Sequence, residues 1–241
     1  MKLALAITAA VLPLTACNFA NGMSGDVVQP SGSGGTRSFQ VADFTGVSLR
    51  GADDVEVRSG TTFAVTAEGD SALLDRLEIR KDGDTLQIGR KDGDWKWGGD
   101  KGAKITVTLP RLLSASVAGS GDMTVERAQG DFDGSIAGSG NLSIAQLTGG
   151  KTGLSIAGSG DLHIAAGQAS AISASIAGSG DIDAPALKAT HGEMSIAGSG
   201  NIRAQVTGEA DISIVGSGSV ELTGGAKCSV NKMGSGDARC S

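Results

Sequence analysis

The chain has 241 residues, a formal net charge of −6 and 39 glycines, while aromatic residues make up only 3% and tyrosine is absent. Glycine is present at more than twice its usual share of about 7%, which argues against a conventional globular core. Because 39% of the residues are hydrophobic and the net charge is negative, the chain is neither disordered nor suited to bind nucleic acid, which leaves an ordered repeat protein.

Residues 1–16 are typical of a bacterial signal peptide. Lys2 precedes an apolar run over residues 3–14 that is too short to span a bilayer, and small residues follow this run. We therefore expect an exported protein whose mature chain begins at Cys17.

The residues around the expected cleavage point resemble the lipobox of bacterial lipoproteins, which implies a lipid on Cys17. They are Leu14-Thr15-Ala16-Cys17, and Asn18 comes next. The membrane is then a partner through this lipid. Because residue 18 is not aspartate, the resemblance implies delivery to the outer membrane, facing the periplasm or the cell surface. The alternative is an ordinary signal peptide with a coincidental cysteine.

Residues 17–38 are expected to be a flexible tether that follows the lipidated cysteine. They contain the run Ser31-Gly32-Ser33-Gly34-Gly35 and few apolar positions. Such a segment buries too little surface to compensate for the entropy lost on ordering.

Residues 39–110 contain short alternating runs, which predict half-buried strands in a strand-rich N-terminal part. Asp82-Gly83 and Asp92-Gly93 are turn sequences, so they place a strand around Leu86 and Ile88 between two bends. Residues 71–80 are the one stretch expected to form a short helix. The alternating runs are Val55–Val57, Phe63–Val65 and Ile105–Leu109.

Residues 111–241 contain an internal repeat in which Gly-Ser-Gly begins at seven positions. The spacings are 19, 20, 20, 20, 18 and 18 residues, which indicates stacked units that bury their apolar faces against one another. The first glycines of the copies are Gly119, Gly138, Gly158, Gly178, Gly198, Gly216 and Gly234.

Each copy of the repeat predicts a strand, a sharp bend and a second strand. Ile156 precedes its glycine by two places, and Leu162 and Ile164 follow at alternate positions, as their counterparts do in other copies. The residue after the second glycine is Asp, Asn or Ser, all of which favour turns. The repeat therefore predicts a parallel β-helix of about 20 residues per coil. A left-handed helix of 18-residue coils is the alternative, and the longer spacings count against it.

The phrase Ser-Ile-Ala-Gly-Ser-Gly followed by Asp or Asn, together with Phe44–Val47 and Gly51–Val57, resembles the head GIN domain family of putative auto-transporter adhesins. The resemblance covers residues 39–241. It implies an all-β fold, a right-handed parallel β-helix with the N-terminal part stacked on it, in secreted or lipid-anchored envelope proteins. It implies no enzymatic activity, no cofactor and no catalytic residue.

One row of outward positions contains acids and bases of the kind that an enzyme uses. Asp161, Asp181 and Asp183 are expected near His163 and Arg203 on one face. Polysaccharide-cleaving β-helices need long loops to build a cleft, and the regular repeat spacing leaves no such loop. We therefore expect a stabilising ladder of ion pairs here.

Two other rows of the repeat suggest ligands. Serine precedes the first glycine by three places in six copies, so its hydroxyls could bind glycans or ordered water, or could simply allow close stacking. Acidic residues after the second glycine suggest calcium, but the replacement of several by Asn141, Asn201 and Ser219 predicts no metal. The serines are Ser116, Ser135, Ser155, Ser175, Ser195 and Ser213.

Both tryptophans of the chain, Trp95 and Trp97, are candidate ligand contacts. They lie two residues apart, so on a strand they face the same side. One interpretation is that they cover an open end of the coil, and the other is that they form an exposed platform for a sugar or a partner.

Cys228 and Cys240 are the cysteines that remain after lipidation of Cys17, and in an exported protein they favour a disulfide. They lie six places before and six places after Gly234, and Cys240 is at an inward position. We expect the bond to close the last coil. The alternative is two buried, reduced thiols.

Together these features predict a non-catalytic lipoprotein of the cell envelope whose β-helix presents an interaction surface. That surface would be adhesive, or would bind a glycan or an envelope protein. One alternative is a carbohydrate-active enzyme that uses the row containing His163 and Asp183, and another is a purely structural spacer.

Overall fold

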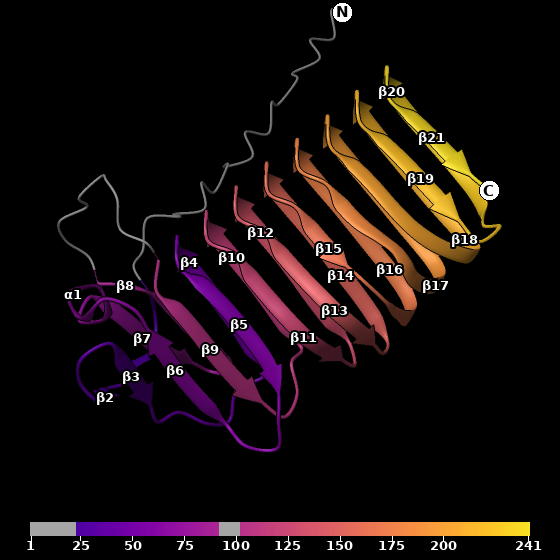
Figure 1. The fold of residues 1–241 in the computed structure, drawn as a ribbon. Helices are drawn as coiled ribbons and strands as arrows, with labels where there is room; N and C mark the ends of the chain where they lie inside the picture. The colour runs from indigo at the N-terminus through magenta and orange to yellow at the C-terminus, as the bar shows by residue number, and fades with distance from the viewer. Residues whose placement is uncertain (1–22, 92–101) are drawn as a thin grey trace, which may run out of the picture.

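The structure is a computed structural model that describes residues 23–91 and 102–241. Stacked coils form an all-β solenoid whose strands lie side by side from one end to the other (Figure 1). In the described ranges the only helix is α1 (Ser71–Leu74). The predicted parallel β-helix is therefore confirmed. No helix within these ranges is long and apolar enough to cross a membrane.

One face of the solenoid, which we call wall A, is a stack of parallel strands that run up to the first glycine of each repeat. The C-terminal parts of three longer strands contribute to this stack. In spatial order its strands are β8 (Thr85–Arg90), β4 (Gly46–Gly51), β10 (Ser114–Gly119), β12 (Phe132–Gly138), β14 (Lys151–Gly158), β16 (Gly167–Gly178), β17 (Ile182–Gly198), β18 (Asn201–Gly216) and β20 (Lys227–Gly234).

A second face, which we call wall B, is the stack of strands that follow the glycine bend. The N-terminal parts of β17 and β18 belong to it. Its other strands are β9 (Lys104–Leu109), β5 (Asp54–Ser59), β11 (Met123–Gln129), β13 (Leu142–Thr148), β15 (Leu162–Ile164), β19 (Ser219–Thr223) and β21 (Asp237–Cys240).

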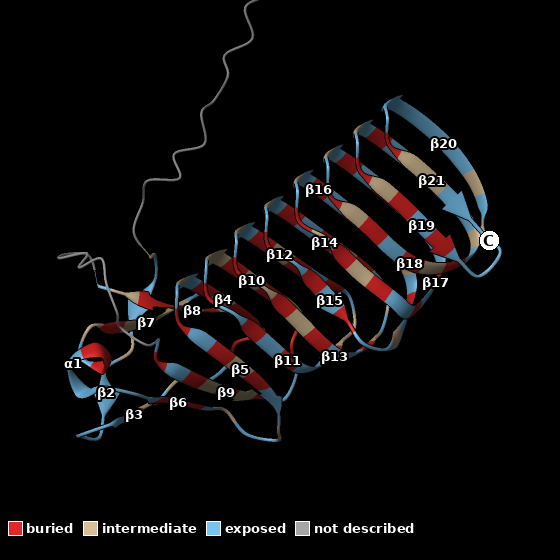
Figure 2. Ribbon diagram, turned by 45° about the horizontal axis from the view of Figure 1, so that its top comes forward, coloured by how far each residue is buried: buried red, intermediate tan, exposed pale blue. Residues whose placement is uncertain are grey.

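The core is built from ladders of aliphatic side chains that point inward on every rung. Ile156 pairs in register with Ile176, and Ile176 with Ile196, so like residues stack along the axis. Buried and exposed residues alternate along the strands (Figure 2). In one coil the inward residues, each at most 3% exposed, are Ile172, Ala174, Ile176, Ile182, Ala184, Leu187 and Ala189.

Both glycines of each Gly-Ser-Gly bend lie close to the preceding rung, but only the first has a positive φ. Gly158 has a φ of +137°, which favours glycine because it has no Cβ. Gly160 has an ordinary φ, but a Cβ there would lie 2.0 Å from the carbonyl oxygen of Gly140 on the preceding rung. The bend therefore allows neighbouring rungs to approach closely while the chain turns from wall A to wall B.

Residues 39–110 contribute two rungs to the solenoid before the Gly-Ser-Gly repeat begins. The strands β4 and β5 form one rung, and β10 and β11 of the repeat stack directly on it. The strands β8 and β9, later in the chain, stack on its other side. The chain thus extends outward to the N-terminal end and then crosses back before the repeat starts.

Antiparallel strands close the N-terminal end of the solenoid. β7 (Leu77–Asp82) pairs with β8, and β6 (Ala64–Glu68) pairs with β9. β3 (Thr36–Phe39) then pairs with β6, β2 (Pro30–Ser31) with β3, and β1 (Asp26–Val27) with β7. The outer edges of β8 and β9, the outermost rung at this end, are therefore hydrogen-bonded to other strands.

The predicted tether over residues 17–38 is wrong for its described part, because β1, β2 and most of β3 lie between residues 23 and 38. Their backbone groups pair with the edges of β6 and β7, which orders a segment of polar composition. Arg37 is 8% exposed and bonds Asp75 at 2.6 Å. The signal peptide and Cys17 lie outside the described residues.

The helix predicted over residues 71–80 is shorter than expected. Asp70 caps α1 by accepting a hydrogen bond from the Ala72 amide at 2.9 Å, and the helix ends at Leu74. The next residues enter β7 because its pairing with β8 buries Leu77 and Ile79. The predicted strand around Leu86 and Ile88 is confirmed as β8.

The C-terminal end is closed differently, by the predicted disulfide. Cys228 and Cys240 are bonded, with Cα atoms 6.6 Å apart. They are in register with the core residues Ala210 and Leu222 of the preceding rung, so the bond links wall A to wall B across the interior. Among residues 23–91 and 102–241, the strands β20 and β21 each pair with the preceding rung only.

Candidate functional site

The acidic and amide residues that follow each bend form a continuous hydrogen-bonded row. Asn141 Oδ1 accepts the backbone N–H of Asp161 at 3.1 Å, and Asp161 Oδ1 accepts that of Asp181 at 3.0 Å. Asp181 Oδ1 in turn accepts the N–H of Asn201 at 2.8 Å. At a bend the regular ladder is interrupted, so these side chains satisfy amides that would otherwise lack a partner.

The outward row on wall B is a ladder of alternating charges. His163 Nδ1 lies 3.2 Å from Asp183 Oδ2, and Arg203 lies 3.7 Å from Asp183. Arg203 also lies 3.6 Å from Glu221 on the next rung. Each carboxylate thus lies beside a basic side chain, and all four side chains are about one-third to slightly more than one-half exposed.

The N-terminal end of wall B pairs its charges in the same way. Glu56 accepts a hydrogen bond from Arg58 at 2.7 Å and lies 3.2 Å from Lys104. The hydrogen bond from Arg58, and next that from Lys104, holds the pKa of Glu56 below its usual value of 4.5. The same contact with Glu56 raises the pKa of Arg58.

The structure brings His163, Asp183 and Arg203 together, as predicted. Asp161 and Asp181 are not part of this group. The two aspartates lie in the neighbouring row, where they accept backbone amides. Within the described ranges, no group of three or more His, Cys, Asp or Glu side chains is placed to hold a metal ion. The wall B row is built as a self-contained ion-pair ladder.

The outer face of wall A carries the predicted row of serines. Ser135, Ser155 and Ser175 are in direct register, and the row continues through Ser195 and Ser213 to Asn231. From Ser155 to Ser213 these hydroxyls are exposed to solvent. They form one side of an outer surface that is also hollowed.

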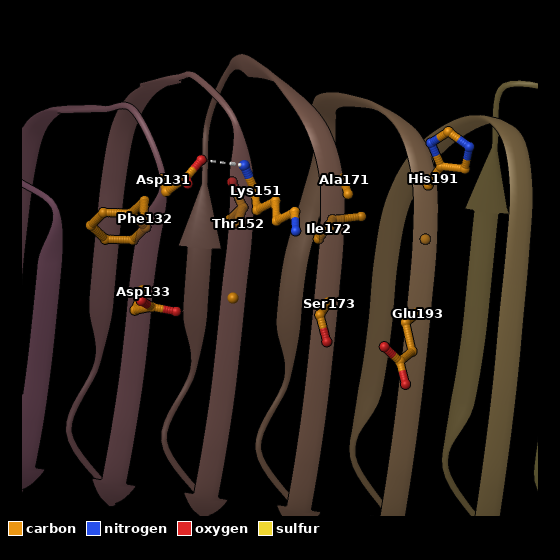
Figure 3. Close-up of a pocket in the computed structure, with 12 residues that line it drawn as sticks. Asp131, Phe132, Asp133, Lys151, Thr152, Ala171, Ile172, Ser173, His191 and Glu193 are labelled. Atoms are coloured by element: carbon orange, nitrogen blue, oxygen red, sulfur yellow. Dashed lines mark hydrogen bonds between the residues drawn. The ribbon is translucent and has the colours of Figure 1, made fainter.

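A hollow of about 530 Å³ crosses four neighbouring rungs of wall A beside the serine row (Figure 3). Its outward side chains include Asp133, Lys151, Ser173, His191 and Glu193. A second hollow of about 240 Å³ continues from Glu193 toward the C-terminal end. We call the two together the wall A groove. Its second part is lined by Glu193, Ser195, Asp211, Ser213, Ser229 and Asn231, among others.

Small residues make the groove hollow. Ala171 lies in register between Lys151 and His191, and Gly153 lies between Asp133 and Ser173. A Cβ on Gly153 would lie 2.5 Å from Asp133 Oδ1, so this carboxylate leans over the glycine of the next rung. The side chains of Phe132 and Ile172 are at most 2% exposed and face the interior, so their backbone forms the floor.

The charged side chains of the groove are not paired with one another. Over residues 23–91 and 102–241, the carboxylates of Asp133, Glu193 and Asp211 form no hydrogen bond or ion pair with protein, and neither does the Lys151 ammonium. Asp131 differs, because its Oδ1 accepts the Lys151 backbone N–H at 2.8 Å. Within the described part of the chain, the groove thus presents free carboxylates, the free ammonium of Lys151 and a line of hydroxyls.

The groove was not predicted from the sequence, apart from the serines. Its row from Asp133 through Gly153, Ser173 and Glu193 to Asp211 contains four residue types at equivalent positions. Aligning the copies of the repeat at this position would have shown the row, because its small residues lie between acidic ones. Trp95 and Trp97, the predicted ligand contacts, lie outside the described residues.

A buried ion pair holds the first rungs in place. Asp53 is 0% exposed and accepts hydrogen bonds from Arg90 at 2.7 and 3.0 Å and from the Ala103 amide at 2.8 Å. It thereby joins the bend between β4 and β5 to the end of β8 and the start of β9. This contact is structural and lies away from the wall A groove.

Comparison with known proteins identifies the family. The family described as "Putative auto-transporter adhesin, head GIN domain" matches residues 43–226. A crystal structure of a putative adhesin from Bacteroides fragilis has a TM-score of 0.80 at 26% identity, covering 89% of this chain and 100% of that chain. No curated protein matches the chain.

Two further solved structures share the fold. One, described as a putative lipid binding protein from Parabacteroides distasonis, has a TM-score of 0.68 at 26% identity and covers 86% of this chain and 96% of its own. The other, a putative adhesin from Parabacteroides merdae, has a TM-score of 0.66 at 20% identity, with 86% and 95% covered. Since the family match spans most of the chain and these solenoids match along nearly their whole length, the protein belongs to the head GIN domain family of adhesin-like β-helix proteins.

Proposed function

We propose that this protein is a non-catalytic adhesin of the cell envelope that binds an extended, uncharged glycan chain in the wall A groove. The observation that carries the proposal is the contrast between unpaired polar groups in this groove and paired ones on wall B. A surface that leaves donors and acceptors free in a hollow is suited to a polar ligand.

The shape of the groove favours a polymer. It crosses the strands and runs along the solenoid axis, so equivalent side chains recur at the rung spacing of about 4.8 Å. A glycan chain in an extended form repeats its hydroxyl groups at a similar interval. Ser195 and Ser213, at equivalent positions of neighbouring rungs, can each donate and accept, which suits the hydroxyls of successive sugars, and Ser173 adds a hydroxyl in the adjacent row.

The charge of the groove favours an uncharged chain over an acidic one. Asp133, Glu193 and Asp211 offer three carboxylates that accept hydrogen bonds from sugar hydroxyls, whereas Lys151 offers one ammonium. The whole chain carries a formal charge of −6. A uronate or sulfated polymer would therefore be repelled, because like charges disfavour close approach.

The lipidated Cys17 and outer-membrane location belong to the same proposal. The lipobox Leu14–Cys17 supports lipid anchoring, and an anchored solenoid would present its groove to a polymer outside the membrane. Protease accessibility on intact cells distinguishes the surface from the periplasmic side. Labelling with a radioactive fatty acid, lost in Cys17→Ala, would support the anchor.

The proposal is tested with an array of neutral and anionic oligosaccharides. We expect binding to a neutral extended oligosaccharide without release of reducing ends. Glu193→Gln removes a free carboxylate and should weaken binding about tenfold or more, because a hydrogen bond to a charged group contributes about 1.5–3 kcal/mol. Ser173→Leu fills the hollow and should weaken binding by a similar factor.

The matched control is Asp183→Asn on wall B, which removes one carboxylate outside the groove and should leave binding unchanged. Absence of binding to every oligosaccharide would contradict the proposal. It would also be contradicted if both groove variants bound the oligosaccharide as tightly as the unaltered protein does. Release of reducing ends that is lost in Asp183→Asn would instead support the enzyme alternative on wall B.

A further inference from the structure

In the first hollow of the wall A groove, one rung of small side chains separates a cation from a carboxylate. Lys151 lies in β14 and Glu193 in β17, and β16 between them contributes Ala171 and Ser173 to the hollow. Ala171 is in register with Lys151, and Ser173 is in register with Glu193. The hollow therefore has a hydrogen-bond donor on one side, an acceptor on the other and a small apolar side chain between them.

The Lys151 ammonium is unpaired although carboxylates line the same hollow. Its side chain extends toward the rung of Ala171 (Figure 3), and within the described ranges its ammonium forms no hydrogen bond or ion pair. The neighbouring Asp131 accepts the Lys151 backbone N–H instead, at 2.8 Å. Because Asp133 and Glu193 would repel an anionic ligand, the ammonium is left to a neutral acceptor.

We propose that this hollow binds the acetamido group of an N-acetylated amino sugar, which rests on the glycan function proposed above and names the class of glycan. A lysine ammonium only donates hydrogen bonds, and a glutamate carboxylate only accepts them. An acetamido group matches both, since its carbonyl oxygen accepts, its N–H donates, and the two point in opposite directions across a planar amide. A hydroxyl group donates and accepts at one atom, so it does not need this fixed order.

The spacing of the rungs agrees with this assignment. Lys151 and Glu193 are two rungs apart, which is about 10 Å at the usual distance of about 4.8 Å between neighbouring strands. The oxygen and nitrogen of an amide are about 2.2 Å apart, so a donor and an acceptor that each lie about 2.9 Å away are separated by about 8 Å. Lysine and glutamate side chains are long enough to make up the difference.

The small side chain of the middle rung leaves room for the methyl group of the acetamido. Ala171 is half-buried, and the residues in register on either side of it are the larger Lys151 and His191. A methyl group packed against Ala171 removes apolar surface from water without leaving a polar atom unpaired. A longer side chain at this position would occupy the same space.

The test is isothermal titration calorimetry of the purified chain with two matched tetrasaccharides. Tetra-N-acetylchitotetraose and cellotetraose have the same length and linkage, and they differ in whether each ring carries an acetamido or a hydroxyl group at one carbon. We expect the acetamido tetrasaccharide to bind about tenfold more tightly or better, because a hydrogen bond with a charged group such as the Lys151 ammonium is stronger than one between neutral groups.

Two groove variants locate the effect. Lys151→Met keeps the length of the side chain without its charge, so the ratio of the two dissociation constants should fall to near one. Ala171→Leu fills the space for the methyl group, so it should weaken binding of the acetamido tetrasaccharide more than that of cellotetraose. The matched control is Lys188→Met, which makes the same change at an exposed lysine of β17 outside the groove and should leave the ratio unchanged. Circular dichroism would verify the fold of each variant.

Equal binding of the two tetrasaccharides would overturn the acetamido assignment, as would a preference that Lys151→Met leaves intact. Binding of a neutral extended peptide as tight as that of the acetamido tetrasaccharide would overturn it too, because a peptide also carries amides. Binding only to acetamido oligosaccharides of another linkage would support it. An array whose tightest neutral ligand lacks acetamido groups would overturn this assignment alone, whereas an array without any bound oligosaccharide would overturn the proposed function as well.

Discussion

Wall A and wall B are built from the same rungs, yet their outer faces use charge in opposite ways. On wall B, Asp183 lies between the basic side chains of His163 and Arg203 and contacts both. On wall A, Asp133 and Glu193 are separated by Gly153 and Ser173, and their carboxylates form no hydrogen bond or ion pair with the described part of the protein. In a solenoid, a row of paired charges stabilises the stack, whereas a row interrupted by small residues leaves its charges available to a ligand.

The largest effect is expected from removing the disulfide that links wall A to wall B in the last coil. Replacing both Cys228 and Cys240 by alanine should lower the free energy of unfolding by about 3 kcal/mol in the chain-entropy model, given a sequence separation of 12 residues. Urea unfolding of the oxidised protein and of the variant measures the difference.

The control for this experiment is the reduced form of the unaltered protein, which should unfold like the double variant. Equal stability of the oxidised protein and the variant would show that the disulfide does not constrain the coil. The groove should still bind its glycan, because its first hollow, at Asp133 and Glu193, lies on earlier rungs.

A smaller effect compares one carboxylate from each wall. Asp183→Asn removes the contacts with His163 and Arg203, and it should lower the free energy of unfolding by less than about 1 kcal/mol, because exposed ion pairs contribute little. Asp133→Asn removes an unpaired carboxylate and should cause no loss. Thermal unfolding at low and high salt measures both, and salt should diminish the Asp183 effect.

The difference between the two walls would be contradicted if Asp133→Asn destabilised the protein as much as Asp183→Asn. It would then follow that Asp133 has a stabilising partner. An effect of Asp183→Asn that did not respond to salt would likewise contradict the ladder, since screening weakens exposed ion pairs.

The smallest expected effect is the pH-dependent contribution of Glu56, at the N-terminal end of wall B, to the free energy of unfolding. Its pKa is lowered, first by the hydrogen bond from Arg58 and then by Lys104. A depressed pKa in the folded state stabilises the protein above the usual value of 4.5, and this contribution is lost as the pH falls through the folded-state pKa. The unaltered protein should therefore be slightly more stable than Glu56→Gln at neutral pH.

That advantage should disappear as the pH is lowered below 4.5. Denaturant midpoints of the two proteins, measured side by side across this range, give the difference directly. A gap between them that stayed constant into strongly acidic solution would mean that the Glu56 carboxylate is not the source.

Features that repeat one residue type could be predicted from the sequence. The spacing of Gly-Ser-Gly and the aliphatic positions on either side predicted the coil, because stacking places like residues on top of one another. The disulfide was predictable because Cys240 occupies a position that is aliphatic in other copies. The ladder through His163 and Asp183 was predictable because acidic and basic residues fall at equivalent positions of neighbouring copies.

Features that depend on close backbone contact, on space left by small side chains, or on strands outside the repeat could not be predicted. The rung formed by β8 and β9 lies outside that of β4 and β5, and no repeat spacing indicates this order. The second glycine of the bend is required by contact with the preceding rung, which only the stacked coils show. The groove needs Asp133 beside Gly153, a combination that no single copy contains.

The most direct test of the difference between the walls is backbone amide chemical-shift mapping of the isotope-labelled protein, titrated with the neutral oligosaccharide that the array selects. We predict shift changes at residues 131–133, 151–153, 171–173 and 191–193, which line the wall A groove. Changes centred on His163, Asp183 and Arg203 of wall B, with none in the groove, would contradict the account.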